Sequence, residues 1–159
     1  MPRLILICGL ICTGKSTYAE GLCRSLPAVN LSVDDLMLQM FGQDAGDMHD
    51  TYTDRAKAYL REQALRLLSG GVHVVLDWGF WIRKEREETL EYFRGRGFSP
   101  ELHFLDISQE EWARRIRKRN ADILSGQTGA YLVDEGLQRK ALSLFERPAP
   151  DEEDVLVPV

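Results

Sequence analysis

The sequence predicts an α/β fold in which helices cover both faces of a parallel sheet. Apolar stretches of strand length alternate with stretches of helical spacing, and short connections join them. The first apolar stretch, Leu4–Cys8, runs directly into a glycine-containing octapeptide at residues 9–16, which a helix follows. With 159 residues and 44% hydrophobic content, the chain can bury one sizeable core. We therefore expect a single domain over residues 1–159.

The expected strands are apolar and rich in β-branched residues, and several of them end in polar or acidic side chains. They lie at residues 4–8, 28–32, 72–77, 101–106 and 155–158. Because the carboxyl ends of parallel strands meet at one edge of a sheet, these polar ends predict a ligand-binding edge.

The expected helices carry apolar residues three and four positions apart and are bounded by start and stop signals. Pro27 ends the first helix, and the pair Gly70 and Gly71 ends the third. Ser108 and Glu111 form a capping box that opens the fifth. The helices are expected at residues 16–26, 36–41, 54–68, 82–95, 108–120 and 132–145.

The octapeptide at residues 9–16 has the pattern of a phosphate-binding loop between a strand and a helix. Gly9 and Gly14 lack a Cβ, so we expect both to adopt positive φ and to turn backbone N–H groups onto phosphate oxygens. Cys12 and Thr13 lie between these glycines and are expected to contact the nucleotide.

Three polar side chains follow the second glycine of this loop. Lys15 is expected to reach the β- and γ-phosphates, and the Ser16 hydroxyl is expected to bind Mg²⁺. Thr17 supplies a second hydroxyl that is expected to contact an outer phosphate.

Acidic residues follow two of the expected strands. Asp34 and Asp35 come directly after the strand at residues 28–32, and Asp77 ends the strand at residues 72–77. Asp34 is expected to accept the proton of an attacking hydroxyl, with Asp35 beside it facing the substrate. Asp77 has the position from which an acid holds Mg²⁺ beside a phosphate loop. The alternative for Asp34 and Asp35 is capping of the following helix, and the alternative for Asp77 is helix capping or a hydrogen bond in the core.

An aromatic cluster at residues 78–81 lies at the same edge. Trp78 is expected either to stack on a planar acceptor or to pack in the core, and both alternatives stay open. Arg83 is the cation of the following helix nearest the strand end, and we expect it to contact the substrate. Residues 41–53 lack periodicity and predict a polar loop that closes over the acceptor.

A basic segment lies near the end of the fifth helix, where five of the six residues at 114–119 are lysine or arginine. A glycine-containing stretch follows, so we expect a lid at about residues 119–131 that lowers arginines onto the transferring phosphoryl group. Arg115 and Arg119 share a helix face and are the expected pair. The alternative is a solvated basic helix end that interacts favourably with the helix dipole.

The net charge of −5 means that no overall basic field attracts nucleic acid or a membrane surface. No apolar stretch is long enough to span a bilayer, and the N-terminal apolar run is too short for a secretory signal. Cys8, Cys12 and Cys23 are odd in number and lack metal-type spacing, which favours reduced thiols. We expect a cytoplasmic protein, either a monomer or a homodimer.

Five segments together resemble one family across nearly the whole chain, namely residues 9–16, 32–35, 74–77, 115–120 and 145–148. On these segments the chain resembles the small P-loop kinase-like proteins, or AAA-type predicted kinases. These are related to zeta toxins, chloramphenicol phosphotransferase, gluconate and shikimate kinases and polynucleotide 5′-kinase domains. The resemblance implies a P-loop NTPase fold with an adenylate-kinase-like core, strand order 2-3-1-4-5 and a small lid. It also implies ATP·Mg²⁺ as the donor and a hydroxyl group as the acceptor.

By the same resemblance, Asp34 matches the general base and Arg147 lies by the adenine. Arg115 and Arg119 match the lid. One position departs from a related group: polynucleotide kinases typically carry an arginine three residues beyond the first of the paired acids, and here that residue is Met37.

Three functions compete on these residues. The first is a kinase that transfers the γ-phosphoryl group of ATP to a hydroxyl of a small molecule. The second is a 5′-hydroxyl kinase for RNA or DNA ends, in which the aromatic residues at 78–81 stack on a terminal base. The third is an ATP-binding switch without an acceptor. A GTPase is not favoured, because the sequence lacks an Asn-Lys-x-Asp segment.

Overall fold

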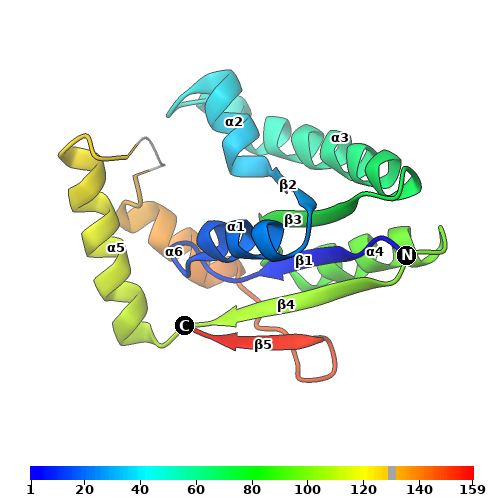
Figure 1. Cartoon of the computed structure of the whole chain (residues 1–159). Helices are drawn as coiled ribbons and strands as arrows, with labels where there is room; N and C mark the ends of the chain where they lie inside the picture. Colours follow the sequence, from blue (N-terminus) through cyan, green and yellow to red (C-terminus); the bar gives the residue numbers. More distant parts are fainter. Residues whose placement is uncertain (129–131) are drawn as a thin grey trace.

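The computed structural model describes residues 1–128 and 132–159. Its centre is a parallel sheet in the order β2-β3-β1-β4-β5, which confirms the predicted strand order (Figure 1). The strands are β1 (Leu4–Cys8), β2 (Ala28–Ser32), β3 (His73–Gly79), β4 (Pro100–Asp106) and β5 (Val155–Pro158).

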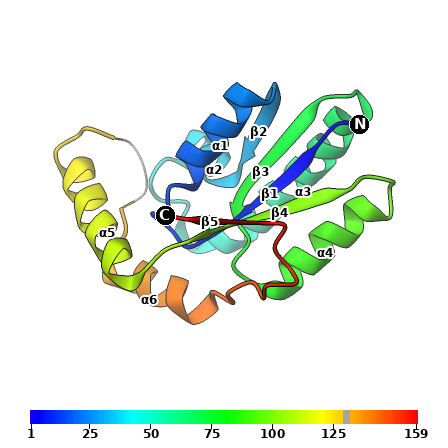
Figure 2. The same ribbon diagram turned by 60° about the horizontal axis from the view of Figure 1, so that its bottom comes forward.

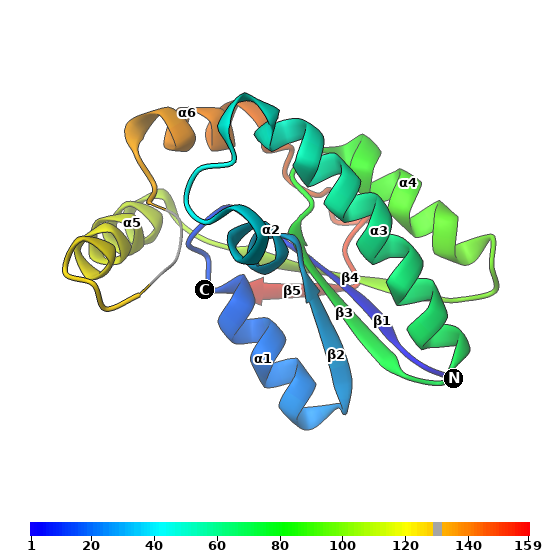
Figure 3. The same ribbon diagram turned by 90° about the horizontal axis from the view of Figure 1, so that it is seen from above.

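Helices alternate with the strands and lie on both faces of the sheet. Figure 3 shows α1 on one side of the sheet and α3 with α4 on the other, and Figure 2 shows α5 near the end of β4. The helices are α1 (Lys15–Ser25), α2 (Val33–Phe41), the 3₁₀ turn η1 (Gly46–Met48), α3 (His49–Ser69), α4 (Arg83–Arg94), α5 (Gln109–Leu124) and α6 (Glu135–Leu144).

Strand β1 is buried on both faces, which explains its unbroken apolar sequence. Leu4 and Leu6 pack in the core that α3 and α4 cover, whereas Ile5 and Ile7 pack in the core beneath α1. Full burial of a leucine or isoleucine side chain stabilises the fold by roughly 1.5–3 kcal/mol. The strand therefore anchors the sheet and fixes where the phosphate-binding loop begins.

The expected loop at residues 41–53 is wrong. Helix α3 begins at His49 and η1 precedes it, so only a short turn follows α2. The second part of this stretch, from His49 on, is the start of α3, where Tyr52 stacks on Phe41 with 4.8 Å between ring centroids. Because most other positions of this stretch are exposed and need no apolar side chain, the sequence shows no helical period here.

Helix α5 is longer than expected and continues to Leu124. The predicted lid at about residues 119–131 therefore begins inside this helix, and its residues 129–131 lie outside the described residues. Within the described part of the chain, none of the helices combines the length and apolar character needed to cross a bilayer.

Candidate active site

The loop at residues 9–16, called the P-loop from here on, connects the carboxyl end of β1 to α1. Gly14 has a φ of 92° and Cys12 a φ of 61°, so the left-handed turns of the loop fall at these two positions. Gly9 is absent from the positive-φ residues, so the expectation for it is wrong. A Cβ on Gly9 would lie 3.0 Å from Thr13 Oγ1 and 3.2 Å from the Leu105 carbonyl oxygen. Gly9 is needed for close packing, not for its φ.

The carbonyl of Leu10 organises the inside of the P-loop. The Thr13 hydroxyl donates to it at 2.9 Å, and the Lys15 ammonium donates to it at 2.7 Å. The Thr13 side chain is buried, so the predicted nucleotide contact of this residue would have to come from its backbone. Burial lowers the pKa of Lys15, while the charges of Asp77 and Asp34 oppose that shift.

Ser16 and Asp77 meet across the end of the sheet, as a shared metal site requires. The Ser16 hydroxyl donates to Asp77 Oδ2 at 3.0 Å. Burial raises the pKa of Asp77, and the Lys15 charge together with the Ser16 hydrogen bond opposes that rise. Among the described residues, no three acidic, histidine or cysteine side chains cluster as a metal site.

Asp34 and Asp35 lie in the first turn of α2, and neither is its cap. The cap is Ser32, whose hydroxyl accepts from the Asp35 N–H at 3.2 Å, so the capping alternative for the two acids is wrong. Both aspartates are exposed, and their charges act on Asp77. The charge of Asp34 also acts on Lys15. The fold thus brings the expected base to the side of the P-loop.

Helix α5 rests on the P-loop through three side chains. The Trp112 indole donates to the Ile11 carbonyl at 2.7 Å, and Arg115 Nη1 donates to the Thr13 carbonyl at 2.8 Å. Arg119 Nη1 lies 3.6 Å from Cys12 Sγ. The expected pair of arginines therefore contacts the P-loop directly from a regular helix.

Glu111 holds the first of these arginines in place. Its Oε1 accepts from Arg115 Nε at 2.7 Å, and both of its oxygens accept from Arg114 at 2.7 Å. The hydrogen bonds from Arg114 and then Arg115 lower the pKa of Glu111 to about 2. Only one half of the predicted capping box is present. The Ser108 hydroxyl accepts from the Glu111 N–H, whereas the Glu111 carboxylate binds Arg114 and Arg115.

Trp78 lies in packing contacts within the protein. Its indole donates to the Leu31 carbonyl at 3.0 Å, and its ring stacks on Phe80 with 5.4 Å between centroids. These are the contacts of the core-packing alternative. They leave a substrate role for Trp78 without support.

Arg83 and Arg147 also have partners within the protein. Arg83 Nε donates to Glu87 at 2.7 Å on the exposed side of α4. Arg147 donates to both carboxylate oxygens of Asp106, at 2.6 and 2.7 Å, and lies over the Phe104 ring. Substrate contact by Arg83 and adenine contact by Arg147 stay predictions.

Two residues of structural importance to the site were missed. Arg86 is fully buried and donates to the carbonyls of Phe80 and Glu146 and to the Glu152 carboxylate. The indole of Trp81 donates to the Gly9 carbonyl at 3.1 Å. The aromatic cluster signalled Trp81, whereas nothing in the local sequence distinguished Arg86 from its exposed neighbours.

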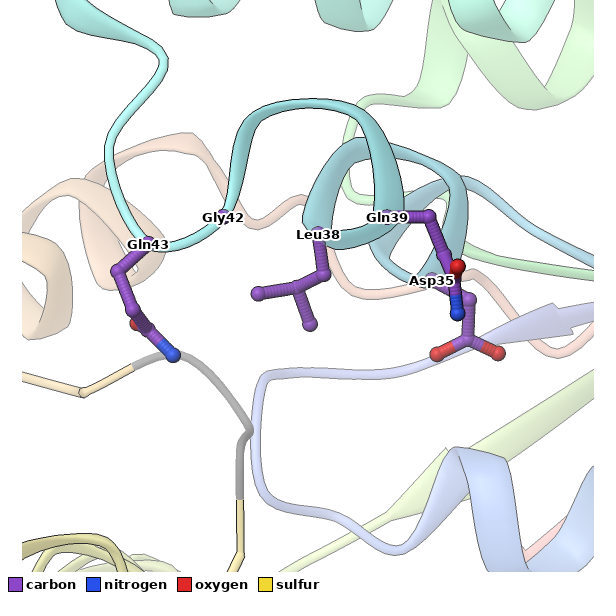
Figure 4. A pocket seen from close by; sticks show the side chains of 5 residues that line it. All are labelled: Asp35, Leu38, Gln39, Gly42 and Gln43. Atoms are coloured by element: carbon purple, nitrogen blue, oxygen red, sulfur yellow. The ribbon is translucent and has the colours of Figure 1, made fainter.

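Elements of the candidate site line two pockets. One lies beside α1 and is lined by P-loop residues together with Thr17, Tyr18, Arg115 and Val159. The other, of about 580 Å³, is lined by α2 and the turn that follows it, including Asp35 (Figure 4). A volume of that size suits a small molecule.

The AAA domain family matches residues 4–143. No curated protein sequence matches the chain.

Three solved structures share the fold. The first is the APS kinase of Mycobacterium tuberculosis in complex with AMPPNP and APS, with 20% identity, a TM-score of 0.70, and coverage of 99% of this chain and 88% of that one. The second is a gluconokinase of Sinorhizobium meliloti, with 20% identity, a TM-score of 0.64, and coverage of 99% and 82%. The third is a chain of the Pnkp1/Rnl/Hen1 RNA repair complex, with 21% identity, a TM-score of 0.69, and coverage of 90% of this chain and 44% of that one. The P-loop NTPase fold and the resemblance to small P-loop kinase-like proteins are thereby confirmed.

Proposed function

We propose that this chain, which belongs to the AAA domain family, is an ATP-dependent kinase that transfers the γ-phosphoryl group of ATP to a hydroxyl group of a small molecule. The observation that carries this proposal is the position of Asp34. It projects from the first turn of α2, and its charge acts on both Lys15 and Asp77. A carboxylate beside a P-loop lysine can hold an acceptor hydroxyl next to the γ-phosphate.

The transfer step assigns one role to each group. The acceptor O–H donates to the Asp34 carboxylate, and the hydroxyl oxygen attacks the γ-phosphorus. The bond between that phosphorus and the β,γ-bridging oxygen breaks, its electron pair leaves with ADP, and the proton passes to Asp34. Most of the rate enhancement is expected from positioning and electrostatic stabilisation.

The cations of the P-loop neutralise the charge that develops during transfer. Lys15 donates to the Leu10 carbonyl, and in the proposed mechanism it exchanges that acceptor for a phosphate oxygen. Arg115 already contacts the loop and is held by Glu111, so its guanidinium is pre-oriented. An arginine that stabilises the transferring group is worth roughly 10³–10⁵ in rate.

Mg²⁺ fits the oxygen donors of this site. The Ser16 hydroxyl and the Asp77 carboxylate, 3.0 Å apart, would hold it. When bound, the ion supplies charge neutralisation on the phosphate oxygens.

A 5′-hydroxyl kinase for nucleic-acid ends is the second candidate, favoured by the fold shared with a chain of an RNA repair complex. Met37 occupies the position where polynucleotide kinases typically carry an arginine, and in this chain its side chain is buried. The aromatic residues that would stack on a base pack within the protein instead. These observations rank the small-molecule acceptor first.

The test is ATP turnover with Mg²⁺ against nucleosides, sugars, aminoglycosides, phenicols and short 5′-hydroxyl oligonucleotides, with the phosphorylated product identified by mass. A phosphorylated small alcohol, with one ADP released per product, supports the proposal. Product on oligonucleotides alone would promote the second candidate. Tight ATP binding with no product on any acceptor would favour a nucleotide-binding switch.

A further inference from the structure

The pocket under α2 has a wall of distinctive composition. Asp35, Leu38, Gln39 and Gln43 contribute side chains to it, and Gly42 completes the lining (Figure 4). The wall therefore offers one carboxylate, two primary amides and an aliphatic surface. None of the described residues that line it is lysine or arginine.

The sequence segment that forms this wall also lacks lysine and arginine. Between Arg24 and Arg55 the sequence contains no lysine or arginine, yet it contains six aspartates. Arg55, the first cation beyond this stretch, does not line the pocket. Residues 129–131, which lie outside the described residues, are glycine, alanine and tyrosine.

The cations of the active site lie on its phosphate side. Lys15 and Arg115 donate to the carbonyls of Leu10 and Thr13 inside the P-loop. On the other side, Asp34 and Asp35 lie in the first turn of α2, and Asp35 lines the pocket. The site therefore divides into a cationic half for the triphosphate and an anionic half for the acceptor.

We propose that the acceptor is a hydroxylated amine, such as an amino sugar, an aminocyclitol or an amino alcohol, whose ammonium group pairs with Asp35. This inference rests on the proposed kinase function and specifies its substrate class. One hydroxyl of the acceptor lies at Asp34 for transfer. The Gln39 amide, one helical turn from Asp35 on the same helix face, binds a further hydroxyl.

The opposite charge is disfavoured for a direct reason. A carboxylate, sulfate or phosphate on the acceptor would face Asp35 without a counter-ion, and like charges at this range repel. Sites that recognise such anions use arginine or lysine, and neither is present among the lining residues that the structure describes. The same argument disfavours a nucleic-acid end, whose phosphates continue past the reacting hydroxyl.

The experiment uses acceptors that share a scaffold and differ in charge. One set is glucosamine, glucose and gluconate; a second is an aminocyclitol, myo-inositol and an inositol monophosphate. Phosphorylation of each by the full chain with ATP·Mg²⁺ is followed by mass. Binding of each is measured separately by calorimetry in the presence of a non-hydrolysable ATP analogue.

The aminated member of at least one set should be the best substrate, by about tenfold or more in kcat/KM over the anionic member. Asp35→Asn should reduce that preference about tenfold without changing the KM for ATP. Gln39→Lys should shift the preference toward the anion. Asp151→Asn, which removes an equal charge from an exposed turn before β5, should change neither the preference for the aminated member nor the KM for ATP. Raising the ionic strength should weaken the preference.

The outcomes separate the two proposals. Product formation that favours the anionic member, or that is indifferent to Asp35→Asn, overturns the charge selectivity and leaves the kinase intact. Binding of the aminated members that Asp35→Asn weakens, without product on any acceptor, supports the selectivity and contradicts the kinase. If no aminated member binds and none is converted to product, the inference is overturned.

Discussion

The indole N–H of Trp81 donates to the carbonyl of Gly9 at 3.1 Å, which ties the segment after β3 to the first residue of the P-loop. The Gly9 N–H donates in turn to the Gly79 carbonyl at 3.0 Å. Both backbone polar groups of Gly9 are thus bound by one neighbouring segment. Arg86 holds that segment from beneath by donating to the Phe80 carbonyl at 3.1 Å.

Trp81→Phe tests this tie. The ring volume is largely kept, but the Gly9 carbonyl loses its donor, which is expected to cost about 1 kcal/mol of unfolding free energy. Because the loop start is then less constrained, the affinity for ATP should fall several-fold. Trp78→Phe is the matched control: it also removes an indole hydrogen bond, to the Leu31 carbonyl, and should destabilise the fold without weakening ATP binding. Equal ATP affinities in the two variants would contradict the role of Trp81.

Asp34→Asn should stop transfer while leaving ATP binding nearly unchanged, because the amide keeps the size of the side chain but cannot accept the proton. The loss of a general base is expected to lower kcat roughly 10²–10⁴-fold. Single-turnover transfer and nucleotide binding should be measured on the same preparation, with Asp151→Asn as the charge-matched control. Full activity in Asp34→Asn would show that another group takes the proton.

Lys15→Met should abolish nucleotide-dependent turnover without lowering the unfolding temperature. Burial lowers the pKa of Lys15, so its charged form costs free energy in the folded protein at neutral pH. Removing that charge relieves the cost, although one hydrogen bond to the Leu10 carbonyl is lost. Turnover measurements test the first expectation, and thermal unfolding tests the second. Lys84→Met on the exposed side of α4 is the control. Retained turnover would rule out the phosphate role of Lys15.

Glu152→Gln should destabilise the fold by about 3–5 kcal/mol, because it leaves the Arg86 guanidinium buried without a carboxylate. The Arg86 side chain is only 1% exposed and lies 3.1 Å from Glu152 Oε1. Denaturant unfolding measures the loss, and Glu153→Gln, at the next position, should have little effect. A change below 1 kcal/mol would mean that the backbone carbonyls alone satisfy Arg86.

Acid should loosen the contact between α5 and the P-loop. The pKa of Glu111 lies below its usual range, at about 2, because Arg114 and Arg115 donate to its carboxylate. A carboxyl whose folded-state pKa is depressed adds stability above its unfolded pKa and loses it as the pH falls through the folded value. The stability that Glu111 contributes should therefore disappear between about pH 4.5 and 2. Melting temperatures across this range should show a flatter acid limb in Glu111→Gln than in Glu110→Gln, and parallel curves would refute the assignment.

The sequence was sufficient for features that depend on local pattern. The strands at Ala28–Ser32 and Val155–Pro158 lie where short, largely apolar stretches predicted them. Residues 9–16 form the predicted turn between a strand and a helix, because a glycine at positive φ and a buried apolar strand are encoded within a few positions. The fold and the strand order followed from the alternation of strands and helices along the chain and from the family resemblance.

Only the tertiary structure decided which side chains contact one another across elements. Arg86 differs from its exposed neighbours in having the Glu152 carboxylate beside it, 66 residues further along the chain. Gly9 is required because Thr13 and Leu105 approach it closely. Ser32, not Asp34 or Asp35, caps α2 because this helix begins one turn earlier than its apolar period suggested. Local propensity and hydrophobic period are properties of short segments, whereas burial of a charge and close approach of a backbone are set by residues distant in sequence.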